Sequence, residues 1–206
     1  MSATKQITVI DSVPSPGTSA CGLAWDGQSF WYYDLAVHSL FQVSVTGEVL
    51  KKYFIESACC DTTFDGRNIW QASPSTLQIF IINPEDGTVV RTLDTPDKCS
   101  GLCFTGENFV RGSWTRKEII YFDPDNCQEI RAIKTAASTS GLTFDGSLFW
   151  HGGEIEGKSF LFSVDPITEI VEKFPIGFTV SGMTFDGKSL WAADGTNNKF
   201  VKLEIE

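Results

Sequence analysis

The hydrophobic and polar positions of the chain describe short strands separated by turns, and the pattern repeats five times. Each repeat opens with a segment in which apolar residues flank an Asp-Gly or Thr-Gly pair, and four of the five segments end in Trp. The segments are residues 22–31, 61–70, 101–110, 141–150 and 182–191. β-branched and aromatic residues dominate the apolar runs, and none of the runs has a helical period. The pattern predicts an all-β protein.

The glycines of these pairs recur every ~40 residues, a period typical of repeat architectures. An Asp-Gly pair between alternating apolar residues predicts a hairpin with a type I′ turn. A polar loop, a third apolar run, a second turn and a fourth run follow in most repeats. Four antiparallel strands per repeat make the blade of a β-propeller. We therefore predict one domain, residues 1–206, folded as a five-bladed β-propeller of four-stranded antiparallel blades and anchored at Gly27, Gly66, Gly106, Gly146 and Gly187.

The two ends of the chain predict how the ring closes. The last repeat stops before its fourth strand, whereas a strand-like segment, roughly residues 5–13, precedes the first repeat. Pairing this N-terminal strand with the C-terminal blade would remove an open sheet edge, which is an aggregation hazard. We expect a propeller that is circularly permuted by one strand.

Length, composition and charge narrow the class of protein. A chain of 206 residues can bury a sizeable core. The net charge of -10 and the lack of a basic cluster argue against nucleic acid or an anionic membrane as partner. No apolar run reaches the 18 residues of a membrane-spanning helix. The N-terminus lacks the pattern of a secretory signal, so we expect a cytoplasmic protein with reduced thiols.

One mouth of the propeller channel is the expected place of function, because variable loops meet there on a rigid scaffold. In the repeat register Cys21 and Cys60 stand just before the first strand of their blades, at positions that hold serine in the other three. Cys59 and Cys99 occupy the preceding position. Four of the six cysteines are therefore predicted to lie around one mouth.

Thiolates gathered in this way would suit Zn(II), Cu(I) or heavier thiophilic ions, and a thiol of lowered pKa could act as a nucleophile. The alternative is that these cysteines pack as small hydrophobic residues. The other two cysteines fall outside the set. The register places Cys103 in the core and Cys127 in an exposed outer turn.

The loops after the second strands supply candidate catalytic groups at the same mouth. Asp34 and Asp194 occupy matching sites on blades that become neighbours when the ring closes, and Glu154 lies one residue further along its own loop. Converging carboxylates could hold a divalent cation or act as acid and base. His151 abuts this mouth and precedes two glycines. The alternative for the aspartates is that they form turns and accept backbone hydrogen bonds.

Four further residues of these loops are candidates for ligand binding. Tyr32, Tyr33 and Trp114 could wall a pocket, or could instead plug the core. Arg111 stands at a position where each of the other blades carries a different type of residue. It could bind an anion or neutralise nearby acids. These alternatives remain open at the level of sequence.

The repeat Gly-Leu-Thr-Phe-Asp-Gly of residues 141–146, with its later Asp-Pro turn, resembles the propeller superfamily that contains virginiamycin B lyase and the plant-type glutaminyl cyclotransferases. The resemblance covers residues 22–206 and implies the propeller fold. The lyase uses a His before a first strand and Mg²⁺-holding glutamates after a second strand. The His positions here hold Cys21, Cys60, Ser100, Ser140 and Ser181, and the glutamate positions hold Asp34, Ser73, Ser113, Gly153 and Asp194. These replacements disfavour the lyase reaction, and Glu154 is the nearest candidate for a cyclotransferase acid.

The sequence leaves several functions open. We favour a protein that binds a small-molecule ligand or a soft metal ion at the cysteine-rich mouth, because a propeller mouth is a preformed concavity. The alternative is an enzyme of lyase, acyl-transfer or cyclotransferase type with its active site at the same mouth, using His151, Glu154, Asp34 and Asp194. The one cofactor that these thiols and carboxylates imply is a divalent or soft metal ion. A protein partner on this face is a third hypothesis.

Overall fold

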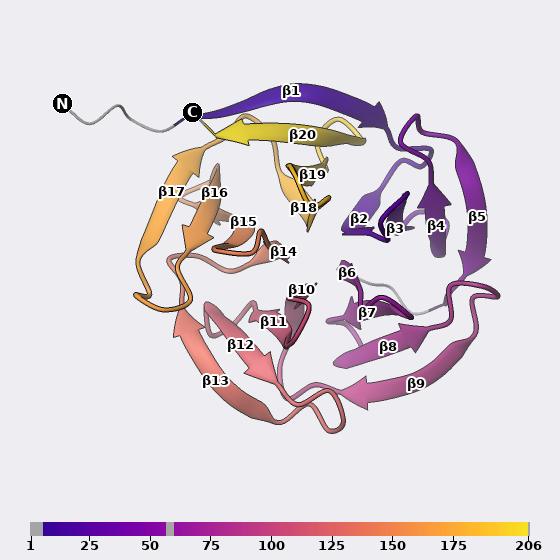
Figure 1. Ribbon diagram of the computed structural model, residues 1–206, viewed down its shortest axis with the longest axis horizontal. Helices are drawn as coiled ribbons and strands as arrows, with labels where there is room; N and C mark the ends of the chain where they lie inside the picture. Colours follow the sequence, from indigo (N-terminus) through magenta and orange to yellow (C-terminus); the bar gives the residue numbers. More distant parts are fainter. Residues whose placement is uncertain (1–5, 57–59, 206) are drawn as a thin grey trace.

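The computed structural model describes residues 6–56 and 60–205, which form twenty β-strands. The strands make five four-stranded antiparallel sheets arranged around a central axis (Figure 1). The predicted all-β, five-bladed propeller is therefore confirmed. The described part of the chain contains no helix that could cross a membrane.

Blades 1 to 3 follow the repeats in order, each running from the axis outwards. Blade 1 consists of β2 (Ala20–Trp25), β3 (Phe30–Asp34), β4 (Ser39–Val43) and β5 (Val49–Phe54). Blade 2 consists of β6 (Asp61–Phe64), β7 (Ile69–Ser73), β8 (Gln78–Ile82) and β9 (Val89–Asp94). Blade 3 consists of β10 (Cys99–Phe104), β11 (Phe109–Ser113), β12 (Glu118–Phe122) and β13 (Glu129–Lys134).

Blades 4 and 5 complete the ring, and the last blade joins the two ends of the chain. Blade 4 consists of β14 (Ser140–Phe144), β15 (Phe149–Ile155), β16 (Lys158–Val164) and β17 (Val171–Pro175). Blade 5 consists of β18 (Val180–Phe185), β19 (Leu190–Asp194), β20 (Lys199–Ile205) and β1 (Ile7–Pro14). The β1 strand pairs with β20 from Ile7–Ile205 to Pro14–Lys199. The predicted closure by the N-terminal strand is confirmed (Figure 1).

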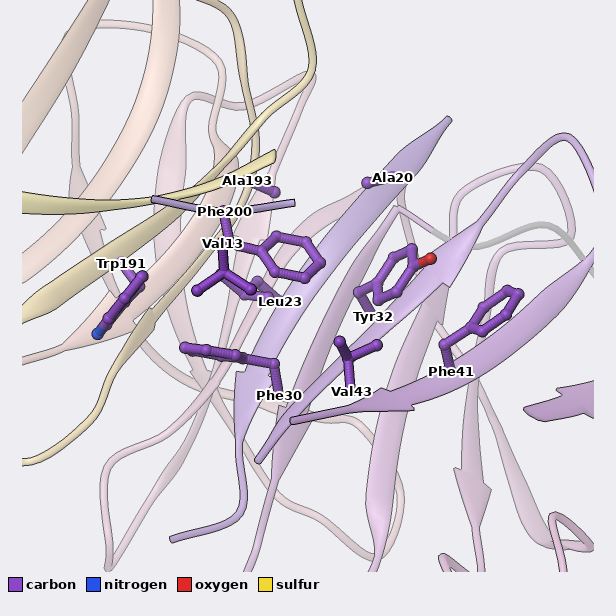
Figure 2. Packing of buried hydrophobic residues seen from close by; sticks show 10 residues of the cluster. All are labelled: Val13, Ala20, Leu23, Phe30, Tyr32, Phe41, Val43, Trp191, Ala193 and Phe200. Atoms are coloured by element: carbon purple, nitrogen blue, oxygen red, sulfur yellow. The ribbon is translucent and has the colours of Figure 1, made fainter. Parts of the chain in front are cut away.

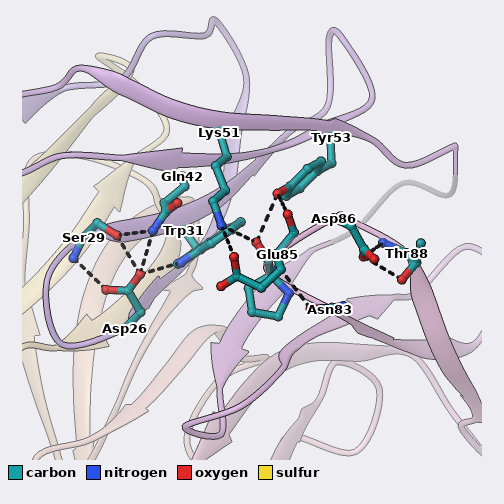
Figure 3. A network of polar contacts seen from close by, with 11 residues as sticks. Asp26, Ser29, Trp31, Gln42, Lys51, Tyr53, Asn83, Glu85, Asp86 and Thr88 are labelled. Carbon is teal, nitrogen blue, oxygen red and sulfur yellow. Dashed lines mark hydrogen bonds and ion pairs between the residues drawn. The ribbon is translucent and has the colours of Figure 1, made fainter.

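In each blade that contains the Asp-Gly pair, the aspartate accepts hydrogen bonds that hold the first hairpin together. In blade 1, Asp26 Oδ1 accepts a backbone N–H bond from Gln28 (2.9 Å). Figure 3 shows its bonds from the Ser29 backbone N–H (2.7 Å) to Oδ1 and from the Trp31 Nε1–H (2.8 Å) to Oδ2. The same Asp–Trp bond recurs in blades 2, 4 and 5 at 2.6, 2.6 and 2.8 Å. This network explains why Asp and Trp recur together.

The predicted type I′ turn is wrong. Gly27 has a φ of 98°, whereas Gln28, the other central residue, has no positive φ. Positive φ at the first central position alone fits a type II′ turn, in which glycine is preferred at that position. The aspartate stands before the turn, where its carboxylate can accept from the amides that follow.

The core consists of apolar side chains packed between neighbouring blades. Between blades 5 and 1, the Phe30 ring meets the Trp191 ring edge-on at 4.9 Å, and the Tyr32 ring meets the Phe200 ring edge-on at 5.1 Å (Figure 2). Full burial of one such side chain contributes about 1.5–3 kcal/mol. Each blade therefore depends on its two neighbours for its stability.

The structure buries both cysteines that were expected to lie away from the mouth. Cys103 is in the core as predicted, but the expectation that Cys127 is exposed is wrong, since only 3% of it is accessible. Cys127 has a φ of 60° at a turn position that holds Gly47 and Gly87 in blades 1 and 2. Its side chain packs in the same apolar cluster as Trp70.

Candidate functional site

A cavity of about 680 Å³ opens at the mouth where the innermost strands begin. One side chain from each blade lines it, all at the same position of the repeat: Cys21, Cys60, Ser100, Ser140 and Ser181. We call these five residues the mouth ring. The surrounding loops add Pro74, Ser75, Lys98, Trp114, Thr139, Thr179 and Val180. The structure thus brings together five positions that the repeat register had aligned.

A second hollow of about 430 Å³ adjoins this cavity on the side of blade 4. Both hollows are lined by Trp114, Ser140, Thr179 and Val180, so they form one continuous depression. Glu154, an exposed residue of β15, lines the second hollow. A cation, Lys98, and a carboxylate, Glu154, therefore lie in the same depression.

The Trp114 side chain is 53% exposed at the junction of the two hollows. Two loops hold its backbone in place. Its N–H donates to the carbonyl of Lys98 (3.1 Å), and its carbonyl accepts from the Ser138 hydroxyl (2.8 Å). The indole is thus presented on a fixed backbone, as a preformed binding surface requires.

Four members of the mouth ring are tied to the next blade by a side-chain hydrogen bond. The bonds join Cys21 to the Cys60 carbonyl (3.3 Å), Ser100 to the Thr139 hydroxyl (2.8 Å), Ser140 to the Val180 carbonyl and Ser181 to the Ala20 carbonyl (2.7 Å). Such bonds satisfy backbone and side-chain groups that the mouth would otherwise leave without a partner. They also hold the ring at a fixed diameter.

Cys60 is the exception in this ring. Within residues 6–56 and 60–205, its thiol makes no hydrogen bond to blade 3. It precedes β6, which has four residues and, in the repeat register, starts one position later than β14 and two positions later than β2, β10 and β18. The Cys21 side chain next to it lowers the pKa of Cys60 below that of an ordinary thiol, because it can hydrogen-bond to the thiolate. Cys60 therefore ionises more readily than an ordinary thiol.

The next residue, Asp61, closes the axis below the ring. Its Oδ2 accepts backbone N–H bonds from Leu102 of blade 3 (2.8 Å) and Leu142 of blade 4 (2.9 Å). The four other blades have glycine at this position: Gly22, Gly101, Gly141 and Gly182. Complete burial raises the pKa of Asp61 well above its usual range, which favours the neutral acid. Sequence reasoning missed this residue, although it is the one carboxyl in a column of glycines.

His151 is fully buried and does not line the cavity. Its Nδ1 lies 2.7 Å from the Gly152 carbonyl, an acceptor, so Nδ1 carries the proton. Its Nε2 then accepts from the Thr135 hydroxyl at 2.6 Å. Burial lowers the pKa of His151 to about 4. These contacts favour a neutral packing residue over an acid–base catalyst.

Asp34 and Asp194 are likewise buried, and their carboxylates accept hydrogen bonds from their own loops and, for Asp34, also from the segment before β2. Asp34 accepts from the backbone of Ser19 (3.0 Å) and Ala36 (2.9 Å). Asp194 accepts from the backbone of Thr196 (2.9 Å) and from Asn197. Neither residue lines the mouth cavity. The structure does not bring them together with Glu154, and it favours the turn-forming alternative.

Three candidate ligand-binding residues are core residues. Tyr32 and Tyr33 are fully buried, and the Tyr33 hydroxyl donates to the Ile55 carbonyl (2.7 Å). Arg111 is fully buried against Asp97, with which it forms an ion pair. This contact favours the charge-neutralising alternative for Arg111. Of the four aromatic and cationic candidates, Trp114 alone lines the cavity.

The proposed ring of four thiols is reduced to two in the described residues. Cys99 is fully buried, donates to the Gly101 carbonyl (3.2 Å), and has its pKa raised by burial. Cys59 lies outside the described residues. Within residues 6–56 and 60–205 no group of three or more His, Cys, Asp or Glu side chains could hold a metal ion. Cys21 and Cys60 are the two described thiols at the cavity.

No protein-family model matches this chain, and no curated protein matches it. The fold defines the class of protein, a five-bladed β-propeller, and solved structures are similar to it. Glutaminyl cyclase from Myxococcus xanthus superposes with a TM-score of 0.80 at 14% identity, covering 98% of this chain and 97% of its own. PQQ-bound aldose sugar dehydrogenase from Streptomyces coelicolor gives a TM-score of 0.63 at 11% identity, with 99% of both chains covered.

Hydrazine synthase from Kuenenia stuttgartiensis is also similar, with a TM-score of 0.56 at 15% identity, covering 88% of this chain and 57% of its own. At such identities the likeness shows the shared propeller fold. The likeness to a propeller glutaminyl cyclase agrees with the resemblance that the repeats indicated. Function has to be argued from the mouth itself.

Proposed function

We propose that the mouth cavity binds a small polar molecule that carries both an anionic and a cationic group, such as an amino acid or a peptide end. The observation that carries this proposal is the convergence of five equivalent side chains on one cavity flanked by Lys98 and Glu154. A volume of about 680 Å³ lies within the range of small-molecule sites.

Each part of the lining has a role in this proposal. Lys98 attracts the anionic group, which matters in a protein of net charge -10. Glu154 accepts hydrogen bonds from the ammonium group of the ligand. The exposed indole of Trp114 covers the part of the ligand between its two charged groups. The serine hydroxyls of the mouth ring donate to the protein and keep lone pairs for ligand donors.

Titration calorimetry with L-glutamine and with a glutaminyl dipeptide tests the proposal. We expect saturable binding of one molecule per chain. Lys98→Ala should weaken it about tenfold, or about 1.4 kcal/mol, because the anion loses its partner. Arg67→Ala is the matched control, since this exposed cation lies in an Asp-Gly turn at the opposite mouth. Absence of binding for both probes, or equal weakening by both variants, would refute the proposal.

A second candidate is an enzyme that cyclises N-terminal glutamine. The TM-score of 0.80 with a glutaminyl cyclase over nearly the full length of both chains favours it, as does the carboxylate of Glu154 in the depression. In this reaction the α-amine attacks the side-chain amide carbon, the C–N bond of the amide breaks, and ammonia leaves. Glu154 would carry the proton from the attacking nitrogen to the leaving nitrogen.

Ammonia release from a glutaminyl peptide measures this activity directly. Glu154→Gln should reduce the rate at least about 100-fold, the usual contribution of a general acid–base group. Glu156→Gln, in the same loop but outside the lining of both hollows, should leave the rate unchanged. Equal rates in the wild type and the Glu154 variant would exclude this mechanism.

A further inference from the structure

The two thiols of the mouth ring come from adjacent blades and lie side by side at the cavity wall. The Cys21 thiol donates to the Cys60 carbonyl at 3.3 Å. Both residues line the cavity. The small-molecule proposal assigns no contact with the ligand to these two thiols.

The number of thiols decides which ion suits the pair. Zn(II) in structural sites takes four protein ligands, and the described residues offer no cluster of even three. Soft monovalent ions prefer thiolate sulfur and are satisfied by two ligands in a linear arrangement. The remaining described thiols cannot contribute, since Cys99, Cys103 and Cys127 are buried inside the blades.

We propose that Cys21 and Cys60 form a two-coordinate site for a soft monovalent metal ion of the Cu(I) class on the wall of the mouth cavity. On binding, two S–H bonds break, two metal–sulfur bonds form and two protons leave to solvent. No electron is transferred, because the ion enters and remains as Cu(I). The site therefore gains one negative charge overall, which Lys98 in the same cavity offsets.

The open position of Cys60 favours ion binding at this point of the ring. The other four side chains each hold a bond to the next blade, and an ion that takes up Cys21 replaces one of these bonds. Cys60 has no such bond to give up within the described residues. Its coordination therefore costs the ring no contact between blades.

Native mass spectrometry of anaerobic protein with Cu(I), and in parallel with Ag(I), tests the site. We expect one ion per chain in the wild type, and none in Cys21→Ser or Cys60→Ser. Both variants should fold, because serine is the natural residue at this position in blades 3, 4 and 5. An ion retained in either variant would overturn the proposal. So would a wild type that takes up no ion.

Two further variants test whether the pair is the complete ligand set. Cys59→Ala should keep the ion with unchanged stoichiometry, and loss of the ion would contradict a two-thiol site. Ser100→Cys adds a thiol from blade 3 to the same ring, so it should raise the affinity for Zn(II) at least about tenfold. An unchanged affinity would show that the ring positions do not converge on one ion.

These outcomes are independent of the proposed function. Small-molecule binding is measured through Lys98 with organic probes, whereas ion binding is measured through Cys21 and Cys60 by stoichiometry. Failure of one proposal therefore leaves the other standing.

Discussion

The two mouths of this propeller contrast sharply. At one mouth four of the five blades carry the same aspartate, with its bond to a tryptophan at 2.6–2.8 Å. At the other mouth each blade contributes different loop residues around a shared ring of serines and cysteines. Repetition at the first mouth stabilises the blades, and variation at the second produces a cavity with charge, thiols and an exposed indole. On a repeat scaffold, a functional site is therefore expected at positions where the residues differ from one repeat to the next.

The largest effect should come from the axis, which both mouths share. A Cβ on Gly182 would lie 2.3 Å from the backbone carbonyl carbon of Gly22. Gly182→Ala should therefore cost about 3 kcal/mol or more in unfolding free energy, because two backbones must move apart. Urea denaturation measures this cost. Gly177→Ala, where a Cβ meets open space, should change stability by less than about 0.5 kcal/mol.

His151 should make stability depend on pH although it stands close to the variable mouth. Its pKa is about 4 in the folded protein, against an ordinary value of 6.5. Below pH 6.5 the His151 imidazole of the unfolded chain is protonated, whereas that of the folded chain stays neutral down to about pH 4. The free energy of unfolding therefore falls as the pH drops through this window. The full loss is about 3 kcal/mol.

The comparison variant for this pH effect is His151→Gln, because Gln71 occupies the equivalent position in blade 2. Urea denaturation of both proteins between pH 7 and pH 4 separates the histidine from the carboxylates that they share. The variant should lose less stability than the wild type over this interval. Parallel curves would show that His151 is protonated in the folded state.

A smaller loss is expected at the repetitive mouth itself. Asp145→Ala removes an acceptor of three hydrogen bonds, from Ser147, Leu148 and the Trp150 indole. The cost should be about 2 kcal/mol, because the buried part of these donors is left without a partner. Thr105→Ala in blade 3, which lacks the tryptophan, should cost less than half as much. Equal costs would mean that the Asp–Trp bond adds nothing to blade stability.

The smallest effect on stability should come from the variable mouth. Trp114 is 53% exposed, so Trp114→Ala should change the unfolding free energy by less than about 0.5 kcal/mol. The same variant should weaken ligand binding at least about tenfold, since the indole covers the ligand in the proposed complex. Thermal unfolding and calorimetry on one sample check both parts. A variant that loses stability and keeps binding would reverse the contrast between the two mouths.

Much of the fold, and part of the site, could be predicted from the sequence. The period of the Asp-Gly segments gave the number of blades, and the strand missing from the last repeat gave the closure by β1. The register aligned Cys21 and Cys60 with serines of other blades, and these residues do line one cavity. The register could not show which neighbouring loop residues face that cavity. From the register, Tyr32, His151 and Arg111 were expected at the same mouth, but they are buried in the structure.

The sequence by itself determined the number, order and closure of the blades, because hydrophobic alternation and turn chemistry are local and recur in every repeat. The tertiary structure alone decided which polar groups are satisfied inside and which remain available to a ligand. Asp34 accepts bonds within its own blade, from its loop and from the segment before β2, whereas Asp61 accepts bonds from two other blades. Those choices depend on where backbone donors from distant parts of the chain meet, and burial leaves few such groups without a partner.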